Sequence, residues 1–143
     1  MKKTRHQGVA LVEFALVLPL LLIMTLLTTE LGRALYQYNT LTKSVRDAVR
    51  YLSIQTPGTH ANEARNLIVY GNLAGTGNPL ALGLTPAHVP APTWQAQGSN
   101  PVISTVTVQI TGYTFTPLLP SVFGVSFGTI PFTSISATMR SHL

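Results

Sequence analysis

The chain opens with a continuous apolar segment long enough to cross a lipid bilayer. From Val9 to Thr29 every residue is apolar except three threonines, one proline and one acid. Twenty-one helical residues span about 31 Å, which matches a hydrocarbon core of about 30 Å. A cleaved secretory signal has a shorter apolar core followed by small residues, and residues 26–30 offer no such site. The pattern predicts one membrane-spanning helix over 9–29, which Pro19 should bend or loosen.

The helix is predicted to continue as an amphipathic segment to about residue 54, where Pro57-Gly58 breaks it. Apolar residues recur there at spacings of three and four, which places them on one face. This predicted stripe comprises Leu31, Ala34, Leu35, Tyr38, Leu41, Val45, Ala48, Val49 and Leu52. Most charged residues fall on the other side, and the spacings of Glu30–Arg33 and Lys43–Asp47 suit helical ion pairs.

The next segment is predicted to contain a short helix and then a long irregular loop. Thr59 is placed to cap a helix over 60–70, which Gly71 would end. Residues 71–101 then contain five glycines, five prolines and three asparagines. Loops of this length are uncommon unless they are functional or mobile. A short strand near Trp94 is expected within it.

From Val102 onward the hydrophobic period changes to that of strands. Residues 102–111 alternate, with Val106, Val108 and Ile110 on one face. Residues 132–140 alternate again, with Ile135, Ala137 and Met139 on one face. Residues 122–127 suit either a further strand or an apolar loop. A small antiparallel sheet is expected, and because two or three strands are marginal alone, the long helix must supply the other wall of the core.

The predicted fold class is therefore α+β, a long N-terminal helix packed by a small antiparallel sheet. We expect three parts: a basic leader over 1–8, a transmembrane half of the helix over 9–29, and an α+β domain over 30–143 with the irregular loop 71–101. The aromatic residues from Trp94 onward are expected to be in the core or between subunits. They are Trp94, Tyr113, Phe115, Phe123, Phe127 and Phe132.

Composition and charge support a membrane protein and exclude several other classes. Only 9% of residues are charged, against roughly 25% in soluble domains. There is no cysteine, so disulfides and thiolate chemistry are excluded. The net charge is +5, of which Lys2, Lys3 and Arg5 supply three. A basic cluster before an apolar run keeps the N-terminus in the cytoplasm while the rest crosses the membrane. No basic patch with interleaved aromatics suits a nucleic acid.

Enzyme chemistry finds little support in this sequence. Gly124–Gly128 fits the G-x-S-x-G pattern around Ser126, but no acid follows it and Pro131 disfavours the helix that the nucleophile elbow requires. The four histidines lack metal-ligand spacing, and the four acids leave no carboxylate pair for acid–base chemistry. No enzyme activity, cofactor or metal is expected.

Glu13 is the one charge within the apolar segment. A carboxylate in a membrane costs a few kcal/mol unless it is neutralised. One interpretation places Glu13 near the membrane interface, where it complements the positive helix N-terminus. The other requires cleavage after Gly8, which creates an α-amino group at Val9, one helical turn before Glu13. In an assembly, the amine of one subunit then meets the carboxylate of the next, and the pair fixes the axial register.

The N-terminal motif resembles the class III signal of type IV pilins: a short basic leader ending in Gly8, then an apolar helix with an acid five residues past the glycine and an aromatic after it. Here these residues are Val9, Glu13 and Phe14. The fuller string GVALVEFALVLPLLL is similar to TadE-like minor pilins, or pseudopilins, of the tight-adherence pilus system. Residues 30–36 and 44–51 are also similar to that family, so the resemblance is strong over about residues 8–52 and weak in the Thr-rich strands.

The resemblance implies processing by an inner-membrane prepilin peptidase between Gly8 and Val9, and a role in assembling or priming an adhesion pilus. Its partners would be the peptidase, other pilins or pseudopilins, the inner-membrane assembly platform and membrane lipid. Glu13 and Phe14 would serve assembly, with Phe14 where major pilins of this system usually have Tyr. The mature chain of 143 − 8 = 135 residues is much longer than the major pilin, which favours a minor component. The C-terminal domain would be periplasmic or incorporated in the extracellular pilus.

Two other hypotheses stay open at the level of sequence. The first is an uncleaved single-pass membrane protein whose periplasmic domain binds a partner. The second is a hydrolase that uses Ser126.

Overall fold

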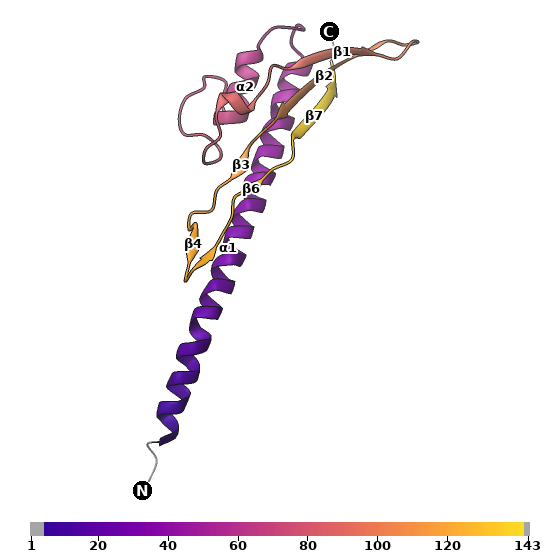
Figure 1. Cartoon of the computed structure of the whole chain (residues 1–143). Coiled ribbons are helices and arrows are strands. Elements are labelled where there is room, and N and C mark those ends of the chain that lie inside the picture. The colour runs from indigo at the N-terminus through magenta and orange to yellow at the C-terminus, as the bar shows by residue number, and fades with distance from the viewer. Residues whose placement is uncertain (1–4, 142–143) are drawn as a thin grey trace. The chain divides into compact units, whose positions relative to one another are not determined.

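The computed structural model describes residues 5–141, with side chains from Gly8 onward, and shows an α+β protein (Figure 1). The helices are α1 (Arg5–Ser53), α2 (Ala61–Tyr70) and the 3₁₀ turn η1 (Pro86–His88). The strands are β1 (Thr93–Gln97), β2 (Ile103–Ile110), β3 (Thr114–Phe115), β4 (Ser121–Val122), β5 (Val125–Ser126), β6 (Ile130–Pro131) and β7 (Ile135–Arg140). The predicted α+β class is confirmed.

The long helix α1 continues through Pro19 and ends one residue before the predicted boundary. It begins earlier than expected, at Arg5, because no helix breaker stands between that residue and Val9 and because Gly8 is tolerated inside a helix. Lys2 and Lys3 lie outside the described residues. Arg5 is the first residue of the helix, and its side chain is not described.

Chain contacts divide the protein into two compact units. The first comprises the described part of Met1–Arg33 together with Pro117–Gly128, and the second comprises Ala34–Thr116 together with the described part of Thr129–Leu143. The pairing of a C-terminal segment with the N-terminal half of α1 was not predicted.

The second unit is built on a three-stranded antiparallel sheet in the order β1-β2-β7. Val106 pairs with Trp94 on one side and Met139 on the other. Val106, Val108 and Ile110 are buried, as their alternation predicted. They share one core with Leu41, Val45, Ala48, Val49 and Leu52 of α1 and with Ala64 and Ile68 of α2. The helix does supply the second wall of the core, while Met139 at the end of its strand is 38% exposed.

Only part of the predicted helical stripe is buried. From Leu41 to Leu52 all its residues lie in the core, and Ala34 is also buried. Leu31, Leu35 and Tyr38 are exposed, so the prediction was wrong for the start of the stripe. Helical spacing places residues on a common face, but burial also requires a neighbour packed against that face. Tyr38 does make an edge contact with the ring of Phe132.

Local predictions for the shorter elements were largely confirmed. The helix over 61–70 forms, and Gly71 ends it in the left-handed conformation with φ 73°. The predicted Thr59 cap is wrong. The cap residue is His60, no side-chain hydrogen bond caps the helix, and the Thr59 hydroxyl donates to the Thr56 carbonyl.

One of the two predicted ion pairs of α1 forms. Among the residues with described side chains, Glu30 and Arg33 form an ion pair, whereas Lys43 and Asp47 do not.

The aromatic residues divide between core and surface. Tyr113, Phe115 and Phe127 are buried as expected, and Phe132 packs against the core. Trp94 is half-buried on β1, which confirms the strand expected in the 71–101 segment. Phe123 is 66% exposed and so lies outside the core of this chain, because it occupies a hairpin turn and not a strand interior; a position between subunits stays a prediction.

Candidate functional site

The surroundings of Glu13 are entirely apolar and entirely exposed. Val9, Leu11, Val12, Phe14 and Leu16 have exposed fractions between 58% and 75%. Glu13 is itself exposed, and no cation among the residues with described side chains pairs with it. Exposed apolar surface of this extent marks a site of contact with lipid or with other protein.

The same helix satisfies the physical requirements of a membrane span. From Gly8 to Ser53 it contains an 18-residue window with a mean hydropathy of 2.6, none of which is buried. The hydroxyls of Thr25, Thr28 and Thr29 donate to the carbonyls four residues earlier, at 2.8–2.9 Å. Each of these hydroxyls therefore has a hydrogen-bond partner within the helix. Polar side chains need such partners in hydrocarbon, where no water is present to supply them.

Val9 and Glu13 share a helical face because α1 includes both and they are four residues apart. Phe14 follows on a different side of the same turn. Gly8 is helical, and a Cβ placed on it would meet nothing within 4 Å. Packing within this chain therefore does not require glycine at position 8, and the same holds for Gly32.

A second carboxylate, Glu30, marks the other end of the apolar segment and was not predicted to bind the C-terminal region. It is 9% exposed and forms an ion pair with Arg33, as the spacing predicted. Its Oε1 also accepts the backbone N–H of Leu118 at 3.3 Å, across 88 positions of sequence. The only sequence signal was an acid directly after an apolar run, with a basic residue three positions later.

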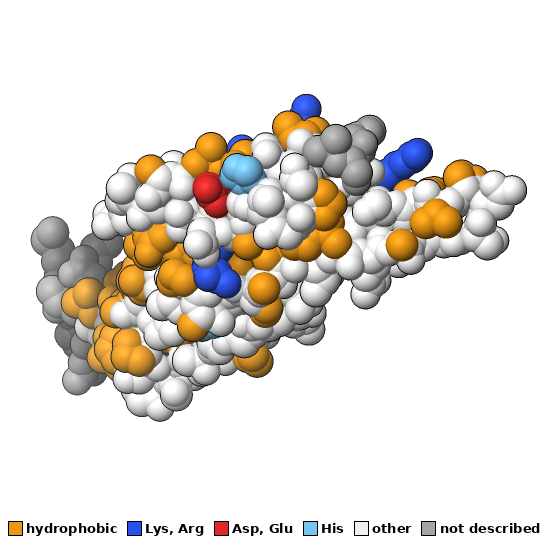
Figure 2. Space-filling model, turned by 90° about the horizontal axis from the view of Figure 1, so that it is seen from above, with side chains coloured by type: hydrophobic (Ala, Val, Ile, Leu, Met, Phe, Trp, Pro, Cys, Tyr) orange, Lys and Arg blue, Asp and Glu red, His pale blue; other side chains and the backbone are white. Residues whose placement is uncertain are grey.

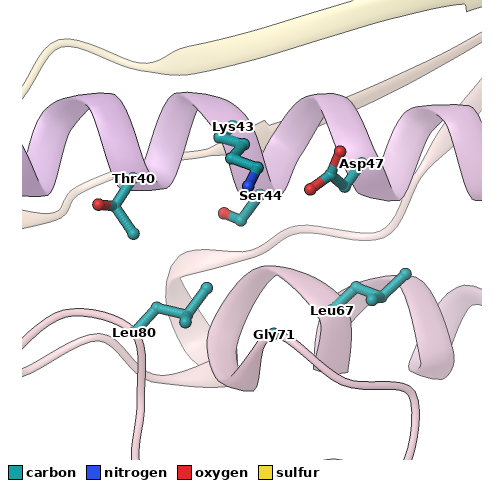
Figure 3. A pocket seen from close by; sticks show the side chains of 7 residues that line it. All are labelled: Thr40, Lys43, Ser44, Asp47, Leu67, Gly71 and Leu80. Atoms are coloured by element: carbon teal, nitrogen blue, oxygen red, sulfur yellow. The ribbon is translucent and has the colours of Figure 1, made fainter.

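A shallow pocket of the second unit lies between α1, α2 and the loop that follows α2 (Figure 3). It is lined by Thr40, Lys43, Ser44, Asp47, Leu67, Gly71 and Leu80 and encloses about 230 Å³. Figure 3 shows Leu67 and Leu80 across the gap from Ser44 and Lys43. The lining combines two leucines with two hydroxyls and the opposite charges of Lys43 and Asp47, and the Ser44 hydroxyl donates to the Leu41 carbonyl at 2.9 Å.

The remaining candidate residues have structural surroundings. Ser126 is exposed in β5, within the hairpin that β4 and β5 form, and no helix follows it, so the strand–turn–helix context of a nucleophile elbow is absent among residues 121–141. His88 Nδ1 accepts the backbone N–H of Thr85, and its ring contacts Tyr113 edge-on. Within residues 8–141 no group of three His, Asp or Glu side chains is placed to hold a metal.

Positive charge is dispersed on the visible surface. On the face shown in Figure 2, blue side chains are scattered among white and orange ones and form no continuous patch.

Together these features define an α+β protein whose single long apolar helix, among the described residues, suggests membrane anchoring. Residues 8–50 match the family model described as TadE-like protein, which confirms the TadE-like resemblance over that segment. The family suggests a protein associated with Tad pilus systems, and it is not an enzyme family. No curated protein and no solved structure matches the chain.

Proposed function

We propose that this protein is a minor pilin or pseudopilin that takes part in assembly of a tight-adherence pilus for surface adhesion. The observation that carries the proposal is the TadE-like match over residues 8–50, within which Glu13 stands alone on an exposed apolar helix. An N-terminal helix of this kind holds a subunit in the inner membrane and supplies the packing surface when subunits assemble.

The proposal includes cleavage between Gly8 and Val9 by a prepilin peptidase, with Lys2, Lys3 and Arg5 holding the leader on the cytoplasmic side. Cleavage would create an α-amino group at Val9. In the assembled state, this amine of one subunit would pair with Glu13 of a neighbour, since two opposite charges are far less costly in an apolar bundle than either alone. Phe14 would pack beside this pair.

N-terminal sequencing of the membrane-bound protein from a strain that makes pili tests the proposal. We expect a mature start at Val9. The variant Gly8→Ala should accumulate with its leader intact and give no pili. The matched control is Gly32→Ala, which makes the same change in the same helix, also without any contact to the new methyl group. It should be processed and assembled normally.

An intact N-terminus at Met1 in cells with functional pili would overturn the pilin assignment and favour an uncleaved membrane protein. Equal processing of Gly8→Ala and the unsubstituted chain would overturn the assignment of the cleavage site.

A further inference from the structure

Residues 117–128 form an apolar hairpin that belongs to the same compact unit as the membrane-spanning part of α1. The segment reads PLLPSVFGVSFG and contains no charged residue and no histidine. Its strands pair Ser121 with Ser126 and Val122 with Val125, and the Phe127 N–H donates to the Pro120 carbonyl at 2.9 Å. Backbone hydrogen bonds thus hold the two strands of the hairpin together, and its side chains are predominantly apolar.

The hairpin presents its apolar side chains outward. Leu118, Leu119, Phe123 and Val125 are between 42% and 66% exposed. Phe123 and Gly124 form the two-residue turn, and both have positive φ, at 50° and 81°. This turn type normally takes Asn, Asp or Gly, and a left-handed conformation costs other residues about 1–2 kcal/mol. A bulky aromatic residue here is both strained and exposed, a combination that points to a function outside the chain's own packing.

The base of the hairpin is fixed at the expected outer boundary of the membrane. Leu118 N–H is bound to Glu30, which is ion-paired with Arg33, and Glu30 directly follows the 9–29 span. Figure 1 shows the hairpin pointing back along α1 towards the N-terminal end of that helix. From Leu118 to Phe123 an extended chain reaches at most about 16 Å, which is roughly half of the hydrocarbon core.

We infer that the 117–128 hairpin is a second membrane contact, which inserts the Phe123 turn into the outer leaflet of the bilayer that α1 spans. The inference rests on the membrane-anchored state in the proposed function. Lipid is the occupant because the hairpin and the apolar span belong to one compact unit and both expose large apolar side chains. Because the segment carries no charged side chain, its insertion does not carry the cost of burying a charge in hydrocarbon. The Glu30–Arg33 pair would then lie at headgroup level.

The cysteine-free chain allows a direct test with single nitroxide labels in the full-length protein. The protein is reconstituted into vesicles of phosphatidylethanolamine with a minor share of phosphatidylglycerol. Collision with oxygen, which concentrates in lipid, is compared with collision with a water-soluble nickel chelate. Phe123→Cys tests the turn and Val125→Cys is a second hairpin position that leaves the turn unaltered. Val102→Cys is the matched control, because Val102 is 63% exposed in the other unit against 66% for Phe123.

We expect the oxygen-to-nickel ratio at 123 and 125 to exceed that at 102 severalfold. Leu16→Cys, within the span, monitors the anchored state. A lipid signal at 16 with ratios at 123 and 125 equal to that at 102 would overturn the hairpin inference and leave the proposed function intact. A water signal at 16 would overturn the membrane anchor itself. Labels at 123 and 125 that are shielded from both reagents and broadened by neighbouring labels would show a protein partner instead of lipid, which also overturns the inference.

Discussion

The two acids at the ends of the apolar segment have different surroundings, and this difference suggests different roles. Glu13 is exposed on the helix, whereas Glu30 is buried, forms an ion pair with Arg33 and accepts the backbone N–H of Leu118. Glu30 lies 17 positions after Glu13, a helical rise of about 26 Å, which is close to the thickness of the hydrocarbon core. Glu30 therefore finds its partners within its own chain. Glu13 has none among the residues with described side chains, and it suits a partner supplied by another subunit.

Replacing Glu13 by alanine should leave membrane insertion intact and impair assembly. Insertion depends on the apolar run, which loses a costly charge, whereas assembly would lose the pair with the neighbouring Val9 amine. We expect pilus yield to fall about tenfold or more, because about 1.4 kcal/mol per contact already corresponds to a factor of ten. The measurement is sheared pilus protein relative to membrane-bound subunit.

Glu63→Ala is the control for Glu13→Ala, since it removes another acid, in the first turn of α2, and should leave the yield unchanged. Normal pilus yield from Glu13→Ala would contradict the role of this carboxylate in setting register.

At the scale of elements, α1 shows how one helix divides between two environments. Its first part has no buried residue between Gly8 and Thr29. From Leu41 to Leu52 one face is packed against β2 residues and α2 residues of the second unit's core. Leu35 keeps the helical spacing of the buried residues but is 65% exposed, while Leu41 is completely buried.

Leu41→Ala and Leu35→Ala form a matched pair in the same helix. Truncating the buried leucine should lower the free energy of unfolding of the second unit by about 2–5 kcal/mol, because it leaves a cavity. Truncating the exposed one should change that free energy by less than about 0.5 kcal/mol. Denaturant titration of the full chain in detergent micelles, followed by emission of the single Trp94, measures both. Equal effects would show that the exposed start of the stripe is packed in solution.

At the scale of the whole molecule, the two compact units differ in how much of their apolar surface is buried. The first contains the apolar span and the apolar hairpin 117–128, and the second contains the packed core and most of the loops. The basic leader predicts that the second unit lies on the periplasmic side of the membrane.

Asn78→Cys tests this orientation, because Asn78 is exposed in a loop of the second unit and the unsubstituted chain has no cysteine to react. A membrane-impermeant maleimide should label the variant in intact spheroplasts as fully as after permeabilisation. The unsubstituted chain provides the background. Labelling that requires permeabilisation would place the second unit in the cytoplasm and contradict the predicted topology.

Patterns within single segments predicted much of this fold. The apolar run, the switch from helical to strand period near Val102, and the glycine that ends α2 each depend on neighbouring residues, so their physical causes are local. The same is true of the Gly8, Val9 and Glu13 motif, whose spacing is fixed once the segment is helical. Thr59 shows the limit of such local inference, because α2 begins at Ala61 and the cap position falls on His60, one residue after Thr59.

The sequence by itself determined a membrane-length helix with one acid, an amphipathic continuation and a set of alternating strands, because those features follow from the order of apolar and polar residues. Only the tertiary structure decided which residues of the stripe are buried. It also joined Glu30 to Leu118 and placed the Tyr113 hydroxyl 2.9 Å from both the Gln37 Oε1 and the Leu82 carbonyl. These contacts link positions 31 to 88 residues apart. No local pattern encodes them, because they depend on how segments pack once the chain has folded.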